Sequence, residues 1–273
     1  MNLNTITELK RPSSADEVTA WKDGYAWLAG GTWLFSEPQV HTDTLIDLAG
    51  LKWQSLAVAS DGGLEVAATC TIHDLCEFKP PKTWKAGALI GECCRSFLSS
   101  FKIWHEASIG GNIVMSLPAG PMISLTTALE GIYTLWPRNG EPRDVNAIDF
   151  VTGNHQNVLA KGELLRSIHL PASALGKRFA FRRASLTHLG RSGVLLIGTI
   201  DDAKKELIIT ITAATARPVQ VRLCGAVTAI EVREAIEAAV PESLWFDDVH
   251  SSPAHRRHLS YHYAEEIRKE LCA

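Results

Sequence analysis

The chain has 273 residues, of which 46% are hydrophobic, so it is long enough to bury a substantial core. Its formal net charge is −3, from 27 basic and 30 acidic residues, and this balance provides no positive field that would attract nucleic acid. No apolar run approaches the ~18 residues that a membrane span requires, and the first residues lack the apolar centre of a secretion signal. We therefore expect a cytoplasmic globular protein with no membrane span and no nucleic-acid partner.

The first elements are short strands and helices that lead to a glycine-rich segment. Ser14 and Glu17 have the spacing of a capping box, which predicts a helix over residues 14–21. Residues 25–28 and 44–48 are predicted strands. The first of these strands runs directly into Ala29-Gly30-Gly31-Thr32, where successive glycines let backbone N–H groups point outward with no Cβ in the way.

A second glycine segment follows the middle elements. Alternation over residues 64–72 predicts a strand that carries Ala67-Ala68-Thr69, residues 86–101 look helical, and residues 103–109 are predicted to form a strand. That strand leads into Ala107-Ser108-Ile109-Gly110-Gly111-Asn112, where Ser108 and Asn112 add side-chain donors. Either segment alone is also compatible with an ordinary Gly-Gly turn. Together they indicate a paired cradle for a diphosphate, whose oxygens accept hydrogen bonds from backbone amides and hydroxyls.

The remaining elements predict α+β architecture in two domains. Residues 122–130 are a predicted helix, residues 132–136 begin a hairpin that turns at Asn139-Gly140, and residues 163–170 are a strand that Pro171 ends. Beyond it the composition shifts to longer elements, so we place domains at residues 1–170 and 171–273. The predicted elements of the second domain are strands at 179–183, 193–200 and 206–213 and helices at 228–240 and 253–271.

Cysteine and histidine patterns give no metal or cluster motif. The six cysteines are scattered without a C-x-x-C pair, so an iron–sulfur cluster would belong to another chain. Cys93-Cys94 is either a redox pair or two core thiols, and free cysteine is more often buried. His255, His258 and His262 share one helix face without an H-E-x-x-H motif, which favours a surface stripe over a zinc site.

The motifs in this order resemble one family: the FAD-binding subunits of molybdenum hydroxylases, such as the medium subunits of carbon monoxide dehydrogenase and xanthine dehydrogenase. The resemblance covers nearly the whole chain. It rests on both glycine segments, on Ala67-Ala68-Thr69, on Pro118-Ala119, on the stretch from Gly162 to Pro171 and on the tail from Ser252 to Leu259. It implies a two-lobed α+β FAD-binding domain of the vanillyl-alcohol-oxidase and p-cresol-methylhydroxylase type, followed by a smaller α+β domain of the carbon monoxide dehydrogenase flavoprotein type.

The resemblance also implies an FAD site. Its diphosphate would lie between the two glycine segments, Leu164 and Leu165 would pack near the isoalloxazine, and Arg182 would be a basic group near the flavin, where a guanidinium favours the reduced anion. Arg182 is equally compatible with a solvated strand residue, and Trp33 with either ring stacking or packing. The implied cofactor-binding residues are Leu28, Ala29, Gly30, Gly31, Thr32, Trp33, Ser108, Ile109, Gly110, Gly111, Asn112, Leu164, Leu165 and Arg182.

The chain departs from the family pattern at two positions. The family usually has an aspartate after Pro118-Ala119 that binds the adenosine part of FAD, but Pro121 stands there, and Leu117 replaces the usual serine. Loss of one charge-assisted hydrogen bond costs about 1.5–3 kcal/mol, which is roughly ten- to a hundredfold in affinity. We therefore expect the isolated chain to bind FAD loosely.

The expected function is electron transfer within a larger enzyme. By the resemblance, a molybdenum-cofactor subunit oxidises the substrate, an iron–sulfur subunit passes single electrons to this chain, and its FAD delivers them to NAD, oxygen or a quinone. The chain itself contributes no catalytic acid or base. The alternatives are a free-standing FAD-dependent oxidase, for which the second domain is small, and a non-enzymatic family member with weakened FAD binding.

Overall fold

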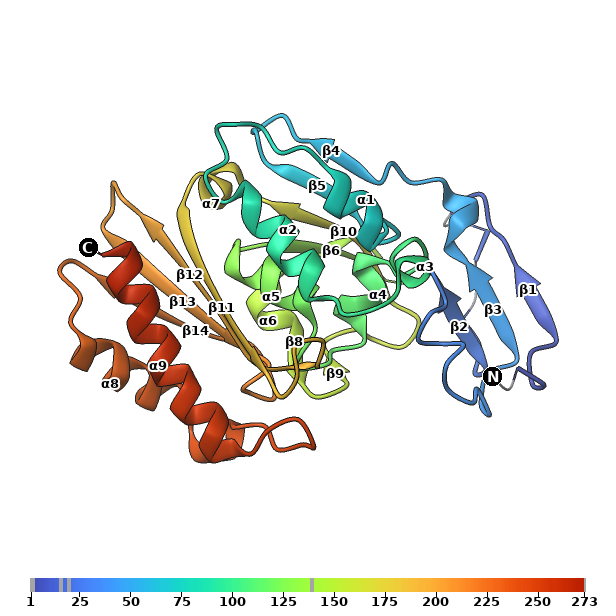
Figure 1. The fold of residues 1–273 in the computed structure, drawn as a ribbon. Coiled ribbons are helices and arrows are strands. Elements are labelled where there is room, and N and C mark those ends of the chain that lie inside the picture. Colours follow the sequence, from blue (N-terminus) through green and yellow to red (C-terminus); the bar gives the residue numbers. More distant parts are fainter. Residues whose placement is uncertain (1–2, 15–16, 19–20, 138–139, 273) are drawn as a thin grey trace.

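The computed structural model describes residues 3–14, 17–18, 21–137 and 140–272. Within these residues the strands form sheets of three, five and four strands and a separate two-stranded hairpin. Figure 1 shows the three larger sheets following one another across the molecule, with the three-stranded sheet at one end and the C-terminal helices at the other. The expected α+β architecture is therefore confirmed.

The three-stranded sheet is parallel and has the order β1-β3-β2. Its strands are β1 (Glu8–Lys10), β2 (Tyr25–Leu28) and β3 (Thr44–Asp47), and the fully buried β3 continues into the 3-10 turn η2 (Leu48–Leu51). The predicted strands at 25–28 and 44–48 are confirmed. The helix predicted over 14–21 includes residues 15–16 and 19–20, which lie outside the described residues.

The five-stranded sheet is antiparallel and has the order β4-β5-β10-β6-β7. Its strands are β4 (Leu56–Val58), β5 (Leu64–Ala67), β6 (Ile132–Trp136), β7 (Arg143–Asn146) and β10 (Leu164–Leu170). The predicted hairpin and the strand at 163–170 are confirmed. The strand expected over 64–72 ends earlier, at Ala67, and Thr71 caps the helix that starts at Ile72.

Short helices surround this sheet (Figure 1). They are α1 (Ile72–Glu77), α2 (Gly87–Ser96), α3 (Phe101–Trp104), α4 (Ile109–Val114), α5 (Pro121–Ala128), α6 (Ala147–Phe150) and α7 (Ala172–Leu175), with the hairpin β8 (Val151–Gly153) and β9 (Gln156–Asn157) beside them. The strand predicted over 103–109 is wrong, because α3 and α4 occupy its ends. Ser100 and Ser108 cap these helices through their hydroxyl oxygens, which accept backbone N–H groups at 3.5 and 3.0 Å.

The four-stranded sheet is antiparallel with the order β11-β12-β13-β14, and all three predicted strands of this region are confirmed. Its strands are β11 (Arg178–Ser185), β12 (Ser192–Asp201), β13 (Glu206–Thr212) and the unpredicted β14 (Val219–Cys224). The helices α8 (Ala229–Ala239) and α9 (Pro253–Leu271) cover one face, and the short 3-10 turn η3 (Glu242–Leu244) lies between them in sequence (Figure 1).

Helix α5 joins the two larger sheets. All eight of its residues are buried, and its Ser124 hydroxyl lies 2.7 Å from the Thr212 hydroxyl of β13. Close by, the backbone N–H of Ala213 donates to the Pro118 carbonyl at 2.7 Å. The apolar core around the five-stranded sheet also includes Leu195 of β12. The third sheet is therefore packed firmly onto the part of the chain that carries both glycine segments.

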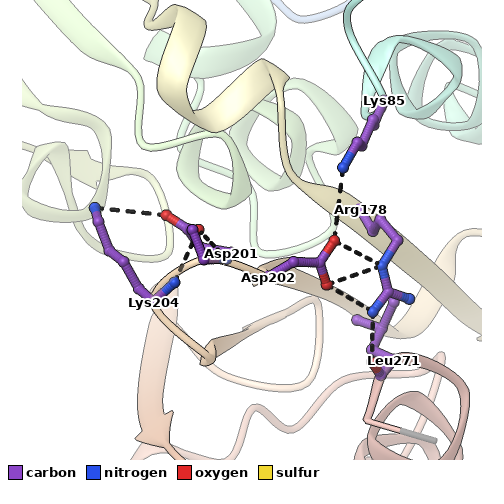
Figure 2. A network of polar contacts seen from close by, with 7 residues as sticks. Lys85, Arg178, Asp201, Asp202, Lys204 and Leu271 are labelled. Carbon is purple, nitrogen blue, oxygen red and sulfur yellow. Dashed lines mark hydrogen bonds and ion pairs between the residues drawn. The ribbon is translucent and has the colours of Figure 1, made fainter.

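A polar network ties the same parts together at the surface. Figure 2 shows Asp202 between Lys85, which precedes α2, and Arg178 of β11. Arg178 binds the Asp202 carboxylate at 2.8–3.1 Å and donates to the Leu271 carbonyl at 2.9 Å. Hydrogen bonding from Arg178 lowers the pKa of Asp202. Exposed ion pairs of this kind contribute little stability singly, so the network mainly fixes the position of the C-terminus.

Cys93, Cys94 and the three histidines of the last helix lie in the core and on the surface, respectively. Cys93 and Cys94 are buried in the core, and burial raises the pKa of the Cys70 thiol to about 12. His255, His258 and His262 are exposed on α9. Across the described part of the chain, no helix combines the length and the apolar character that crossing a membrane would need.

Candidate functional site

The two glycine segments meet in the structure. A Cβ on Gly30 would lie 1.5 Å from the carbonyl oxygen of Glu106 and 3.2 Å from the backbone nitrogen of Ala107. Both distances are shorter than ordinary van der Waals contact, so only glycine fits at position 30. The first segment therefore packs directly on the residues that precede Ser108, and two sequence motifs some 75 positions apart are neighbours in space.

The first segment presents free backbone donors. Gly31 has φ +67°, a left-handed conformation that glycine adopts without strain, and its carbonyl accepts the N–H of Phe35 at 2.8 Å. The backbone N–H groups of residues 30–33 donate no hydrogen bond to any other described residue. These residues are half-buried or exposed, so their amides are available to an anion from outside the chain.

The second segment uses its amides internally. The N–H of Ile109 donates to the Cys70 carbonyl and that of Gly110 to the Ala68 carbonyl, both at 2.9 Å. The N–H of Gly111 donates to the Ser108 hydroxyl oxygen at 3.0 Å, which leaves the Ser108 hydroxyl hydrogen as a donor. We expected two open backbone cradles, but only the first segment leaves its amides free. The second segment forms the first turn of α4.

Ala68 explains why the second segment needs glycine. A Cβ on Gly110 would lie 2.5 Å from the Ala68 Cβ and 2.6 Å from the Ala68 carbonyl oxygen. The backbone N–H of Ala68 in turn donates to the Arg166 carbonyl of β10 at 3.0 Å. The sequence pointed to Ala67-Ala68-Thr69 only as a motif, and the structure shows that its small side chains let α4 approach the sheet.

Asn112 connects the second segment to α5. Its side-chain oxygen Oδ1 accepts the backbone N–H of Met122 at 3.1 Å, which satisfies a free donor at the start of this helix. Pro121 is the first residue of α5 and is buried, while Leu117 is half-buried. The Asn112 side-chain oxygen thus already accepts a hydrogen bond from within the chain.

Leu164 and Leu165 lie on β10, where they are buried beside Trp136 and Leu135 of β6. The start of β10 also reaches the first sheet, because the Trp27 indole donates to the Gly162 carbonyl at 3.3 Å. The pair of leucines therefore follows a point of contact between the first and second sheets.

Glu163 fixes the start of this strand. Its buried carboxylate binds Arg143 through two hydrogen bonds of 2.7 Å and also accepts the N–H of Ala160 at 2.9 Å. Hydrogen bonding from Arg143 lowers the pKa of Glu163. The ion pair thus holds β7 and the approach to β10 in one position.

Arg182 makes its contacts within the third sheet and its covering helix, not with the glycine segments. It is on β11, and its guanidinium binds Glu266 and Glu270 of α9 at 2.7 Å each. Among the described residues, no recorded contact joins Arg182 to either glycine segment. Its charge is balanced within the third sheet and its covering helix.

Comparison with known proteins identifies the family to which this fold belongs. Residues 5–173 match the model of the FAD binding domain in molybdopterin dehydrogenase. The match covers more than half of the chain, so the chain belongs to this family, and FAD is the cofactor that the family binds. The free amides of residues 30–33 and the close approach at Gly30 fit such a group.

Relatives and solved structures agree with this assignment. Xanthine dehydrogenase 1 of Arabidopsis thaliana is 26% identical over 133 residues, which is 46% of this chain and 10% of that protein. The aligned part is thus about a tenth of the length of this relative. Carbon monoxide dehydrogenase from Hydrogenophaga pseudoflava has a chain of the same fold, with a TM-score of 0.82, 18% identity and 97% of each chain covered. Quinoline 2-oxidoreductase from Pseudomonas putida 86 gives a TM-score of 0.80, 18% identity and coverage of 98% and 96%.

Proposed function

We propose that the chain is the FAD-binding, electron-transferring subunit of a molybdenum hydroxylase. One observation carries the proposal: Gly30, which opens the segment of free amides at residues 30–33, packs on Glu106 and Ala107, the two residues that precede Ser108. Neutral donors gathered from two segments suit a diphosphate. Bound FAD supplies a centre that exchanges electrons singly on one side and in pairs on the other.

In this proposal the site residues have different tasks. Leu28 and Ala29 lead the chain into the site, the segment of residues 30–33 donates backbone N–H groups, and Ser108 donates its hydroxyl. Leu164 with Leu165 forms an apolar wall for the flavin ring. The amides of Ile109, Gly110 and Gly111 hold the second segment in place through Cys70, Ala68 and Ser108. Asn112 orients α5. A flavin role for Arg182 competes with its two carboxylate partners on α9.

The family and the named relatives suggest the partners in this proposal. We propose that electrons reach the chain from iron–sulfur clusters of a partner subunit and that a molybdenum-cofactor subunit oxidises the substrate. The external acceptor would be NAD, oxygen or a quinone. The carbon monoxide dehydrogenase and quinoline 2-oxidoreductase chains, which share the fold, support this arrangement.

The domain division at residues 170 and 171 is part of the proposal. Strand β10 ends at Leu170, the third sheet begins at Arg178, and the family match ends at residue 173. Residues 1–170 would bind FAD, and residues 171–273 would form the smaller domain that packs on α5. The shared core implies that the two domains unfold together.

Purification from the native host tests the proposal. We expect a complex with visible absorption bands near about 375 and 450 nm from oxidised flavin, together with iron, sulfide and molybdenum. A purified chain that never acquires flavin, even after incubation with excess FAD, would refute the FAD-binding role. Stoichiometric flavin on a chain without metal-containing partners would refute the assembly but keep the FAD site.

Pro121 favours a second candidate, a family member in which FAD binding is weakened. Pro121 is buried at the first position of α5, where its side chain offers no hydrogen bond to a nucleotide. A variant Pro121→Asp tests this idea, because a carboxylate in the first helical turn is also compatible with the helix. We expect FAD affinity about ten- to a hundredfold higher, and equal affinity would remove the support for weakened binding.

A further inference from the structure

Trp33 and His155 form a contact between the first sheet and the rest of the chain. The two ring centroids are 6.0 Å apart with an interplanar angle of 45°. Trp33 follows the free amides of the first glycine segment, whereas His155 belongs to the β8–β9 turn about 120 residues later. The contact therefore spans the same boundary as the close approach of Gly30 to Glu106.

His155 is held firmly on its side of the boundary. Its backbone has φ +56°, which is uncommon for a residue with a side chain, and its N–H donates to the Ser116 carbonyl at 3.0 Å. Asn157 supports the same turn, because its side-chain amide donates to the Val114 carbonyl at 2.9 Å and to the Ser116 hydroxyl at 3.0 Å. These hydrogen bonds hold the backbone of the turn against the end of α4, and the exposed His155 ring projects from it to meet Trp33.

Trp33 lies on the side of the three-stranded sheet. Its ring is 37% exposed, and the strand that precedes its segment belongs to the three-stranded sheet, which stands at one end of the molecule (Figure 1). Covering an exposed aromatic ring with a second ring removes apolar surface from water and lowers the free energy. Trp33 therefore favours the arrangement in which the first sheet lies close to the β8–β9 turn.

We propose that Trp33 and His155 act as a latch across this boundary, which holds the first sheet closed over FAD and slows its release. This inference rests on the proposed FAD site. In the arrangement that the structure shows, Gly30 packs on Glu106 and Ala107 and the amides of residues 30–33 are free, so the latch and a bound diphosphate would stabilise the same arrangement. Trp33 and His155 are therefore positioning residues for the nucleotide, and they act as a pair.

The test compares FAD release from four variants of the full chain, measured by trapping released FAD with an excess of an unrelated apoflavoprotein. His155→Asn removes the ring, and asparagine tolerates the left-handed backbone. Trp33→Leu removes the other ring, Trp33→Phe keeps one, and His258→Asn is the control because His258 is exposed on α9. We expect about two- to tenfold faster release for His155→Asn and Trp33→Leu, an intermediate rate for Trp33→Phe, and a rate near wild type for His258→Asn.

Two further measurements separate a latch from a general structural effect. In the double variant Trp33→Leu with His155→Asn, release should be no faster than in the faster single variant, because either change already breaks the contact. The thermal midpoints of all apo forms should agree. Wild-type release rates in both single variants, or multiplied effects in the double variant, would overturn the latch. A wild-type chain that binds no FAD would overturn the proposed function and the latch with it.

Discussion

Replacing Gly30 by alanine should weaken FAD binding while leaving the apo fold intact. The new Cβ would lie 1.5 Å from the Glu106 carbonyl oxygen, and ordinary contact begins at 3.4 Å, so the two segments must separate. The apo chain relieves this clash when the first sheet moves away from the residues before Ser108. FAD binding has to reverse that movement, because its diphosphate needs donors from both segments.

The size of the effect follows from the cost of overpacking. Forcing an extra carbon into a packed contact costs about 1–3 kcal/mol, which corresponds to about 5- to 140-fold weaker FAD binding. Gly176→Ala is a matched control, since its Cβ would meet its nearest atom, the Ala172 carbonyl oxygen, at 3.4 Å. Flavin-fluorescence titration of both variants measures the two affinities. If Gly30→Ala binds FAD as tightly as Gly176→Ala, the two segments do not share the nucleotide.

Three other changes test separate parts of the structure. Asn112→Ala should lower the free energy of unfolding in urea by about 0.5–2 kcal/mol, because the Met122 N–H loses its acceptor, whereas Asn112→Asp should retain it. Arg143 lowers the pKa of Glu163, so their pair stabilises the fold above about pH 4.5 and is lost as the pH falls through the lowered pKa; Glu163→Gln should flatten this loss in pH-dependent urea unfolding. Arg182→Met should lower the thermal midpoint and leave the flavin reduction potential unchanged if Arg182 only holds α9, whereas a shifted potential would support a flavin role.

The sequence predicted the long elements well because their signals are local. The hairpin around Gly140, the strand that Pro171 ends and the helix that Ser252 caps each depend on a turn or cap residue next to a periodic apolar pattern. Residues 103–109 were misjudged for the opposite reason. Their alternation suits a strand, but the serines at 100 and 108 cap helices too short to show a helical period.

The site was predicted in outline but not in its hydrogen bonding. Glycine pairs after apolar runs indicated an anion cradle, and the first segment has the free amides that this requires. The amides of the second segment are not free, because the Cys70 and Ala68 carbonyls, about 40 residues earlier in the chain, accept the N–H groups of Ile109 and Gly110. No local pattern reports such a pairing. The place of His155 was equally hidden, because its ring meets Trp33 only after the chain has folded.

The composition of the two segments explains how a chain of net charge −3 can hold a diphosphate. Residues 28–33 and 108–112 contain no lysine or arginine, so the proposed site relies on dipolar donors held in place by the backbone. Such donors work only when the chain fixes their direction in advance, because a flexible amide would turn to water. The contacts at Gly30 and Gly110 supply that rigidity, since each lets two backbone segments approach more closely than a side chain would permit. Glycine at these positions therefore serves the cofactor by allowing close packing as much as by exposing amides.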